Sequence, residues 1–226
     1  MSSRRRSGRG ILSVVGPHSG CGKTLFVLSL LRHVGGLGCL KISPKRDWPA
    51  VLENVPGTVE TDFVLEDSAR LERPGKDTAR YLEAGALEVQ RLRHRAAGLA
   101  AGLEEAWQRF PAMMPVLVES SSAVPLLEPV AVVLVVRPPL REMKPATEAI
   151  LERVTDLLVN ASDREGSATG AAESLAREFP VLRPQFTWAA DLISEPPPEG
   201  LMERMRVLLT TATRDQSRTT GRRTRP

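Results

Sequence analysis

Apolar and polar positions alternate with two different periods in the first fifty residues. A short, partly β-branched run at residues 11–15 is followed by a segment with helical spacing at 24–34 and by a second apolar run at 39–42. Glycines bound each of these segments. This order predicts a strand, a helix and a second strand.

The same alternation continues along the chain. Fully apolar runs predict strands at residues 114–118, 130–136 and 157–159. Helical spacing predicts helices at residues 96–110, 145–156 and 166–178, and a last amphipathic helix at 199–212. Strands that are apolar on both faces are typical of a parallel sheet covered by helices. We therefore predict an α/β fold: a doubly wound, mainly parallel sheet with helices on both faces.

Two stretches interrupt this pattern. Residues 43–78 are polar and contain four prolines, so they form an active-site loop or a small insertion. Past Phe186 the pattern fades, and prolines at 196–198 form a stiff spacer before the last helix.

Composition limits the classes of protein to consider. The chain has 226 residues, of which 42% are hydrophobic, and this suffices for one sizeable core. Its longest apolar stretch, residues 130–136, is far shorter than the ~20 residues that cross a bilayer as a helix. The first arginines are not followed by the apolar region of a secretory signal, so we expect a cytoplasmic protein without a membrane span. Two cysteines are too few for a disulfide framework.

The positive charge lies at the two ends of the chain. The net charge is +4, yet residues 1–10 and 214–226 each carry +4, which leaves −4 on the segment between them. Both ends are rich in Ser, Thr and Gly and poor in apolar residues, so we predict disordered basic tails at 1–9 and 214–226 around one domain at 10–213. No aromatic residues lie among these arginines, and we do not expect a nucleic-acid partner.

A glycine-rich segment with the sequence Gly-Pro-His-Ser-Gly-Cys-Gly-Lys-Thr joins the first strand to the first helix. Backbone N–H groups and the positive end of the helix dipole converge in such a turn, which predicts a phosphate loop of a P-loop NTPase. Lys23 would contact the β- and γ-phosphates as a catalytic residue, and the Thr24 hydroxyl would bind Mg²⁺. An ordinary strand-to-helix turn is the alternative. The predicted nucleotide contacts are Gly16, His18, Ser19, Gly20, Cys21, Gly22, Lys23 and Thr24.

Five residues, rather than the usual four, separate Gly16 from Gly22. This spacing resembles the loop of the dethiobiotin synthetase and cobyrinate diamide synthase group. The ParA and MinD ATPases of the same branch carry a second lysine early in the loop, where this chain has His18, so the resemblance disfavours a positioning ATPase.

A second motif resembles the molybdopterin-guanine dinucleotide biosynthesis protein B family. The family signature Gly-Lys-Asp-Ser/Thr, then Arg, then Ala-Gly-Ala is matched by residues 75–80 and 84–86, and the motifs follow in order over about residues 10–192. The sequence departs from the family at residues 41–45, which replace a histidine-rich stretch. The resemblance implies a GTP-binding role in molybdenum-cofactor biosynthesis, with a nucleotidyltransferase or molybdopterin as partner. The wider branch implies a homodimer.

Several carboxylates are candidates for holding magnesium. Glu119 ends an apolar strand, where it would hold Mg²⁺ as the Walker B residue and take part in catalysis, or else cap an exposed strand end. Asp47, Asp62 and Asp67 follow the second strand, and we choose Asp67 as a further metal ligand because, of the three, it precedes the second motif most closely. A solvated loop charge is the alternative for each of these three.

Two further pairs are candidates for contacting the nucleotide. Lys76 and Asp77 would bind phosphate or substrate, although Asp77 could equally cap a helix that starts at residue 78. Asn160 and Asp163 follow a late strand and resemble the Asn-Lys-x-Asp element with which GTPases read guanine, but Ala161 replaces the lysine. The alternative is that Asp163 caps the next helix.

These motifs support three functions. The first is a GTP-binding, weakly hydrolytic accessory protein that needs GTP (or ATP) and Mg²⁺. The second is an ATP-dependent ligase of the dethiobiotin or cobyrinate synthetase type. The third is a nucleotide-switched scaffold whose arginine tails bind a polyanion. The second motif favours the first function, and base preference separates it from the second.

Overall fold

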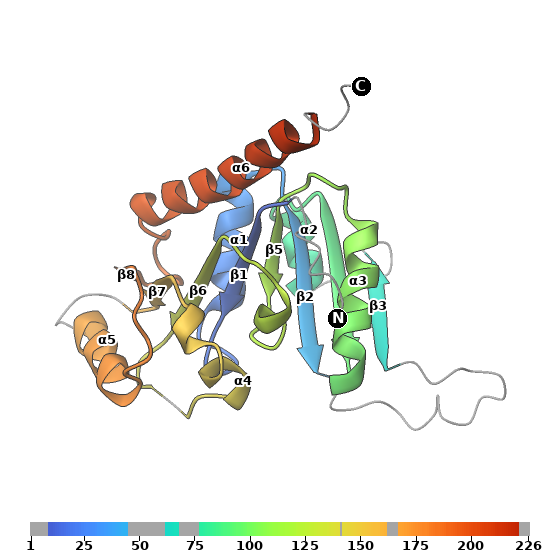
Figure 1. Ribbon diagram of the computed structural model, residues 1–226. Helices are drawn as coiled ribbons and strands as arrows, with labels where there is room; N and C mark the ends of the chain where they lie inside the picture. Colours follow the sequence, from blue (N-terminus) through green and yellow to red (C-terminus); the bar gives the residue numbers. More distant parts are fainter. Residues whose placement is uncertain (1–8, 45–61, 68–76, 141, 162–166, 222–226) are drawn as a thin grey trace.

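The computed structural model describes residues 9–44, 62–67, 77–140, 142–161 and 167–221 (Figure 1). Its centre is an eight-stranded sheet in the order β3-β4-β2-β5-β1-β6-β7-β8. All neighbouring strands are parallel except β3 and β4, which pair antiparallel. The strands are β1 (Ile11–Val15), β2 (Gly38–Pro44), β3 (Phe63–Asp67), β4 (Glu88–His94), β5 (Val116–Glu119), β6 (Ala131–Val136), β7 (Asp156–Val159) and β8 (Phe186–Ala189).

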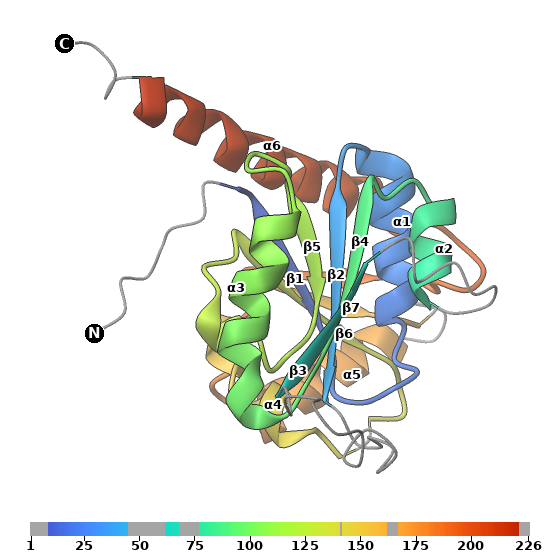
Figure 2. The same cartoon turned by 90° about the vertical axis from the view of Figure 1, so that its right-hand side faces the viewer.

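Helices cover both faces of the sheet, as Figure 2 shows for α3 on one side and α1 and α2 on the other. Alternate residues of β1 explain this: Leu12 and Val14 pack in the cluster that contains α1, α2 and α6, whereas Ile11 packs with α3. A third cluster joins α5 to β6 and β7. The helices are α1 (Lys23–Val34), α2 (Asp77–Glu83), α3 (Leu99–Arg109), α4 (Pro145–Glu148), α5 (Ser167–Glu178) and α6 (Glu199–Gly221). The predicted α/β architecture is confirmed.

Three strands, β3, β4 and β8, were not predicted from the sequence. β3 lies inside the polar stretch 43–78, and β4 alternates charged and apolar residues, so β4 has no fully apolar run. In β8, Phe186 and Thr187 are exposed because this strand lies at the edge of the sheet. The sequence therefore predicted the centre of the sheet but not its two edges.

The helix predicted at residues 145–156 is wrong. Helix α4 is a single turn, a 3-10 turn follows at Leu151–Arg153, and Asp156 begins β7. Asp156 is fully buried and accepts hydrogen bonds from Arg204 and Trp188, a contact that favours the strand over a continued helix.

Parts of both predicted tails belong to the folded chain. Arg9 lies 5.3 Å from the centre of the Trp107 ring and donates to the Trp107 carbonyl at 3.2 Å. Helix α6 continues to Gly221, into the segment predicted to be disordered. Residues 1–8 and 222–226 lie outside the described residues. Within the described part, no helix has both the length and the apolar character to cross a membrane.

Candidate functional site

The phosphate loop connects β1 to α1 as the sequence predicts, and its glycines have conformational reasons. Gly20 and Gly22 have φ angles of 82° and 109°, in the left-handed region that favours glycine. A Cβ atom on Gly16 would lie 2.5 Å from the Cys21 sulfur. No side chain caps the start of α1. The backbone N–H groups of its first turn can therefore donate to another acceptor, such as a phosphate.

The Lys23 side chain reaches back across the loop. Its Nζ atom donates to the His18 carbonyl at 2.7 Å and lies 3.4 Å from the Cys21 sulfur. The Cys21 side chain is fully buried, and its thiol donates to the same His18 carbonyl at 3.3 Å. The Lys23 ammonium is therefore held over the loop, where it would meet a bound phosphate.

Glu119 lies beside the loop at the end of β5. It is 7% exposed, and the register of the sheet places it between Val14 of β1 and Lys41 of β2. Its Oε2 atom lies 3.5 Å from Lys41 Nζ and accepts a hydrogen bond from the Tyr81 hydroxyl. Lys41 also forms an ion pair with Asp77, the first residue of α2.

Tyr81 lies beside Thr24 and Glu119, two of the three residues predicted to hold magnesium. Its hydroxyl donates a hydrogen bond to Glu119, and the Thr24 side chain lies close enough to lower the pKa of the hydroxyl slightly. Burial, and next the negative charge of Glu119, raise the pKa of Tyr81 far above its ordinary value, so the hydroxyl keeps its proton. Thr24 and Glu119 are therefore neighbours, and hydroxyl and carboxylate oxygens are ligands that suit Mg²⁺.

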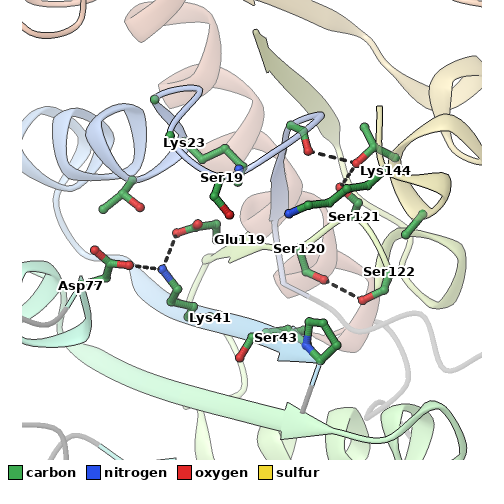
Figure 3. Close-up of a pocket in the computed structure, with 18 of the residues that line it drawn as sticks. Ser19, Lys23, Lys41, Ser43, Asp77, Glu119, Ser120, Ser121, Ser122 and Lys144 are labelled. Atoms are coloured by element: carbon green, nitrogen blue, oxygen red, sulfur yellow. Dashed lines mark hydrogen bonds and ion pairs between the residues drawn. The ribbon is translucent and has the colours of Figure 1, made fainter. Parts of the chain in front are cut away.

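A cavity of about 680 Å³ opens over these residues. Figure 3 shows Lys23 and Ser19 of the loop, Glu119, Lys41 and Asp77 around it, with the serines that follow β5 and Lys144 at another side. The predicted site residues that line it are Gly16, Ser19, Gly20, Gly22, Lys23, Thr24, Asp77 and Glu119.

The serines after β5 hold the loop from outside. Ser121 contacts the Thr147 hydroxyl at 2.8 Å, and Thr147 donates to the Gly16 carbonyl at 3.0 Å. Ser120 and Ser122 contact each other at 3.1 Å. Ser121 therefore supports the phosphate loop through Thr147, whereas Ser120 and Ser122 bond to each other.

Asn160 ties the loop to the far part of the sheet. Its side chain is 2% exposed, donates to the Cys21 carbonyl at 3.0 Å and accepts from the Leu192 backbone N–H at 3.0 Å. Asn160 thus joins the phosphate loop, the end of β7 and the segment after β8.

Some predicted residues are not brought to this site. Asp67 pairs with Gln90 in the antiparallel register of β3, toward the edge where the parallel strands begin. The phosphate loop lies at the opposite edge, so the choice of Asp67 as a metal ligand is wrong for a topological reason. Asp47, Lys76 and Asp163 lie outside the described residues.

The sequence reasoning did not select Lys41 or Tyr81. The sequence offers one local signal for Lys41, which is its position as a charged residue inside an otherwise apolar run. That run forms β2, which ends at the same edge of the sheet as β5. Tyr81 gives no signal of its own, because its role depends on how α2 packs. Among the described residues, no three His, Cys, Asp or Glu side chains gather as a metal-binding group.

No protein-family profile matches the chain. No curated protein matches it either. A crystal structure of a zinc-bound triple mutant of the YjiA GTPase aligns at 11% identity and a TM-score of 0.44, covering 88% of this chain and 62% of that one. The chain thus spans less than two thirds of that protein, and a match at this level carries no information on activity. The mostly parallel sheet, and the glycine-rich loop between its central strand and α1, are those of a P-loop NTPase α/β fold.

Proposed function

We propose that the chain binds GTP together with Mg²⁺ and hydrolyses it slowly. The observation that carries this proposal is the convergence, in one cavity, of the Lys23 ammonium, the Thr24 hydroxyl and the Glu119 carboxylate at the mouth of the β1–α1 loop. A loop of backbone N–H groups at a helix start, with a lysine above it, is suited to a polyphosphate.

Thr24 and Glu119 are the residues that would hold the magnesium ion. When bound, the ion would neutralise charge on the phosphates. Lys23 would add a second positive charge at the phosphates, and the buried position of Glu119 keeps its carboxylate close to Thr24. These groups would bind and orient a triphosphate. A site whose residues have only these two roles agrees with slow hydrolysis.

The choice of guanine over adenine rests on Asn160. Its two hydrogen bonds support the loop in the way that the Asn of an Asn-x-x-Asp element does, and the sequence continues to Asp163 at the required spacing. A carboxylate there would accept hydrogen bonds from the two N–H donors of guanine, which adenine lacks. The nucleotide base would then lie on the β7 side of the phosphate loop.

The sequence motifs extend the proposal to a biological role. The match at residues 75–80 and 84–86 supports an accessory role in attaching GMP to molybdopterin, with a nucleotidyltransferase as partner. The resemblance of the phosphate loop to the wider branch supports a homodimer as the working form. The test is to assay GMP attachment by such a transferase with and without this chain. An unchanged rate and yield would contradict the role.

Calorimetry with GTP and with ATP, each with Mg²⁺, tests the nucleotide proposal. We expect GTP to bind at least tenfold more tightly than ATP, and Lys23→Ala to weaken GTP binding at least a hundredfold while the circular dichroism spectrum stays native. Arg32→Ala, at the exposed far end of the same helix, is the matched control and should bind as the unchanged chain does.

The outcomes separate the alternatives. Absence of binding to either nucleotide would overturn the proposal, as would native affinity in Lys23→Ala. Preference for ATP would favour the ligase of the dethiobiotin type instead.

A further inference from the structure

Lys41 is a charged residue in the middle of a buried strand. It belongs to β2, pairs in register with Glu119, and its side chain is 18% exposed toward the cavity. Its ammonium meets Asp77 and Glu119 and lies 5.9 Å from the centre of the Tyr81 ring. An ammonium so placed is both paired and accessible from the space over the phosphate loop.

The order of the strands indicates how a bound nucleotide would be oriented across the sheet. β1, which leads into the phosphate loop, has β6 and β7 on one side and β5 and β2 on the other. In the proposed function the base would lie on the β7 side, where Asn160 follows the strand and bonds to the phosphate loop. The terminal phosphate of such a nucleotide must then lie toward β5 and β2.

The cavity lies on both sides of β1 and reaches β2. Its lining includes residues 41–44 of β2, His94 at the end of β4, and Glu119 with the serines after β5, and on the β6 side it includes Lys144, Ala146 and Thr147. None of its described lining residues comes from β7 or β8. Adjacent strands lie about 4.8 Å apart, so β2 is about 10 Å across the sheet from β1. A lysine side chain covers much of such a distance.

We infer that Lys41 is a second phosphate-contacting lysine, which binds the terminal phosphate and makes the site prefer a triphosphate to a diphosphate. This inference rests on the proposed function. Lys23 holds the phosphates that GDP and GTP share, whereas Lys41 meets the phosphate that GTP alone carries. Hydrogen bonds to charged groups change affinity by roughly tenfold to a hundredfold.

The competing explanation is that Lys41 only fixes α2. Its ion pair with Asp77, together with the bond from Tyr81 to Glu119, joins α2 to β2 and β5. Removal of Lys41 would then disturb the site as a whole and weaken GDP and GTP alike. The two explanations therefore differ in the ratio of the two affinities.

The test is calorimetry with GDP and with the non-hydrolysable β,γ-imido analogue of GTP, both with Mg²⁺. We expect Lys41→Met to weaken the triphosphate analogue tenfold to a hundredfold and GDP less than threefold. Lys41→Gln keeps a donor for Asp77 and should give the same pattern, which guards against a folding defect in the first variant. Arg91→Met is the matched control, because Arg91 pairs in register with Lys41 on the neighbouring strand and forms an ion pair with Glu66 but does not line the cavity. It should leave both affinities within threefold of those of the unchanged chain.

Three results would overturn the inference while leaving the proposed function intact. They are an equal loss for both nucleotides in the Lys41 variants, unchanged affinities in these variants, or an equally large loss of the triphosphate preference in Arg91→Met. Loss of the native circular dichroism spectrum in both Lys41 variants would make Lys41 structural and would also overturn it. If the unchanged chain binds neither GDP nor the analogue, the proposed function itself fails.

Discussion

Tyr81 is the single tyrosine of the chain, and its hydroxyl is buried beside a carboxylate. The phenolate form would place a second negative charge next to Glu119 in a site with little water. The neutral hydroxyl instead donates to Glu119 and so offsets the burial of that carboxylate. The ionisation of this one residue therefore reports on the integrity of the magnesium side of the site.

Alkaline titration followed by phenolate absorbance tests this environment. Burial, reinforced by Glu119, raises the pKa of Tyr81, so the native state holds this proton more tightly than the unfolded state does. The stability that Tyr81 contributes is complete below its ordinary pKa of about 10 and decreases as the pH rises above that value. We expect the phenolate signal to appear only together with the loss of the native circular dichroism spectrum.

Tyr81→Phe is the control for that titration. It lacks the phenol, so the part of the alkaline loss of stability that depends on Tyr81 should disappear. A phenolate signal with a midpoint near pH 10 in a protein that is still native would contradict the buried contact with Glu119.

At the level of elements, the phosphate loop depends on its contact with the end of β7. Gly20 and Gly22 both have positive φ, but their surroundings differ. A Cβ on Gly22 would lie 2.4 Å from the Asn160 amide nitrogen, whereas a Cβ on Gly20 would meet nothing within 4 Å. The same substitution at the two positions thus separates backbone strain from displacement of Asn160.

We expect Gly22→Ala to weaken GTP binding at least tenfold more than Gly20→Ala does. Both carry the strain of a positive φ, of the order of 1 kcal/mol, and only the first displaces Asn160 from the Cys21 carbonyl. Adding Asn160→Ala to each variant, with calorimetric measurement, should remove most of the difference between them. Equal losses in the two single variants would show that Asn160 does not control the loop.

The elements also show what the sequence could predict. The strands β1, β6 and β7 could be predicted because they are buried on both faces and therefore consist of apolar runs. The loop at 16–24 could be predicted because its glycines and its lysine lie next to one another in the sequence. β4 could not be recognised, since one of its faces is only partly buried and carries charged residues. The antiparallel direction of β3, which removes Asp67 from the site, depends on pairing with a distant strand. For the same reason the sequence could not bring Lys41 to Glu119.

At the scale of the whole molecule, α6 connects the end of the chain to its beginning. It contacts both α1 and β1, and a Cβ on Gly10 would lie 2.8 Å from the Leu209 carbonyl. Arg204 of α6 binds the fully buried carboxylate of Asp156 at 2.9 Å and covers the Phe186 ring at 4.1 Å. The helix therefore secures β7 and β8 as well as the first strand.

This position makes α6 a determinant of global stability rather than of nucleotide binding. Met205 is fully buried in the cluster shared with α1, whereas Val207, two residues further along the helix, is 44% exposed. We expect Met205→Ala to lower the free energy of unfolding by about 2–5 kcal/mol, because it leaves a cavity against the central sheet. Val207→Ala, the matched control, should change it by no more than about 0.5 kcal/mol.

Urea unfolding measures both changes, and calorimetry with GTP at a temperature where both variants are folded completes the comparison. Because the cavity over the phosphate loop has no described lining residue from α6, the GTP affinity of folded Met205→Ala should match that of the unchanged chain within a factor of two. Equal stability of the two variants would contradict the packing of α6 on the sheet. A large loss of GTP affinity in Met205→Ala would instead mean that α6 controls the shape of the phosphate loop through α1, which it contacts directly.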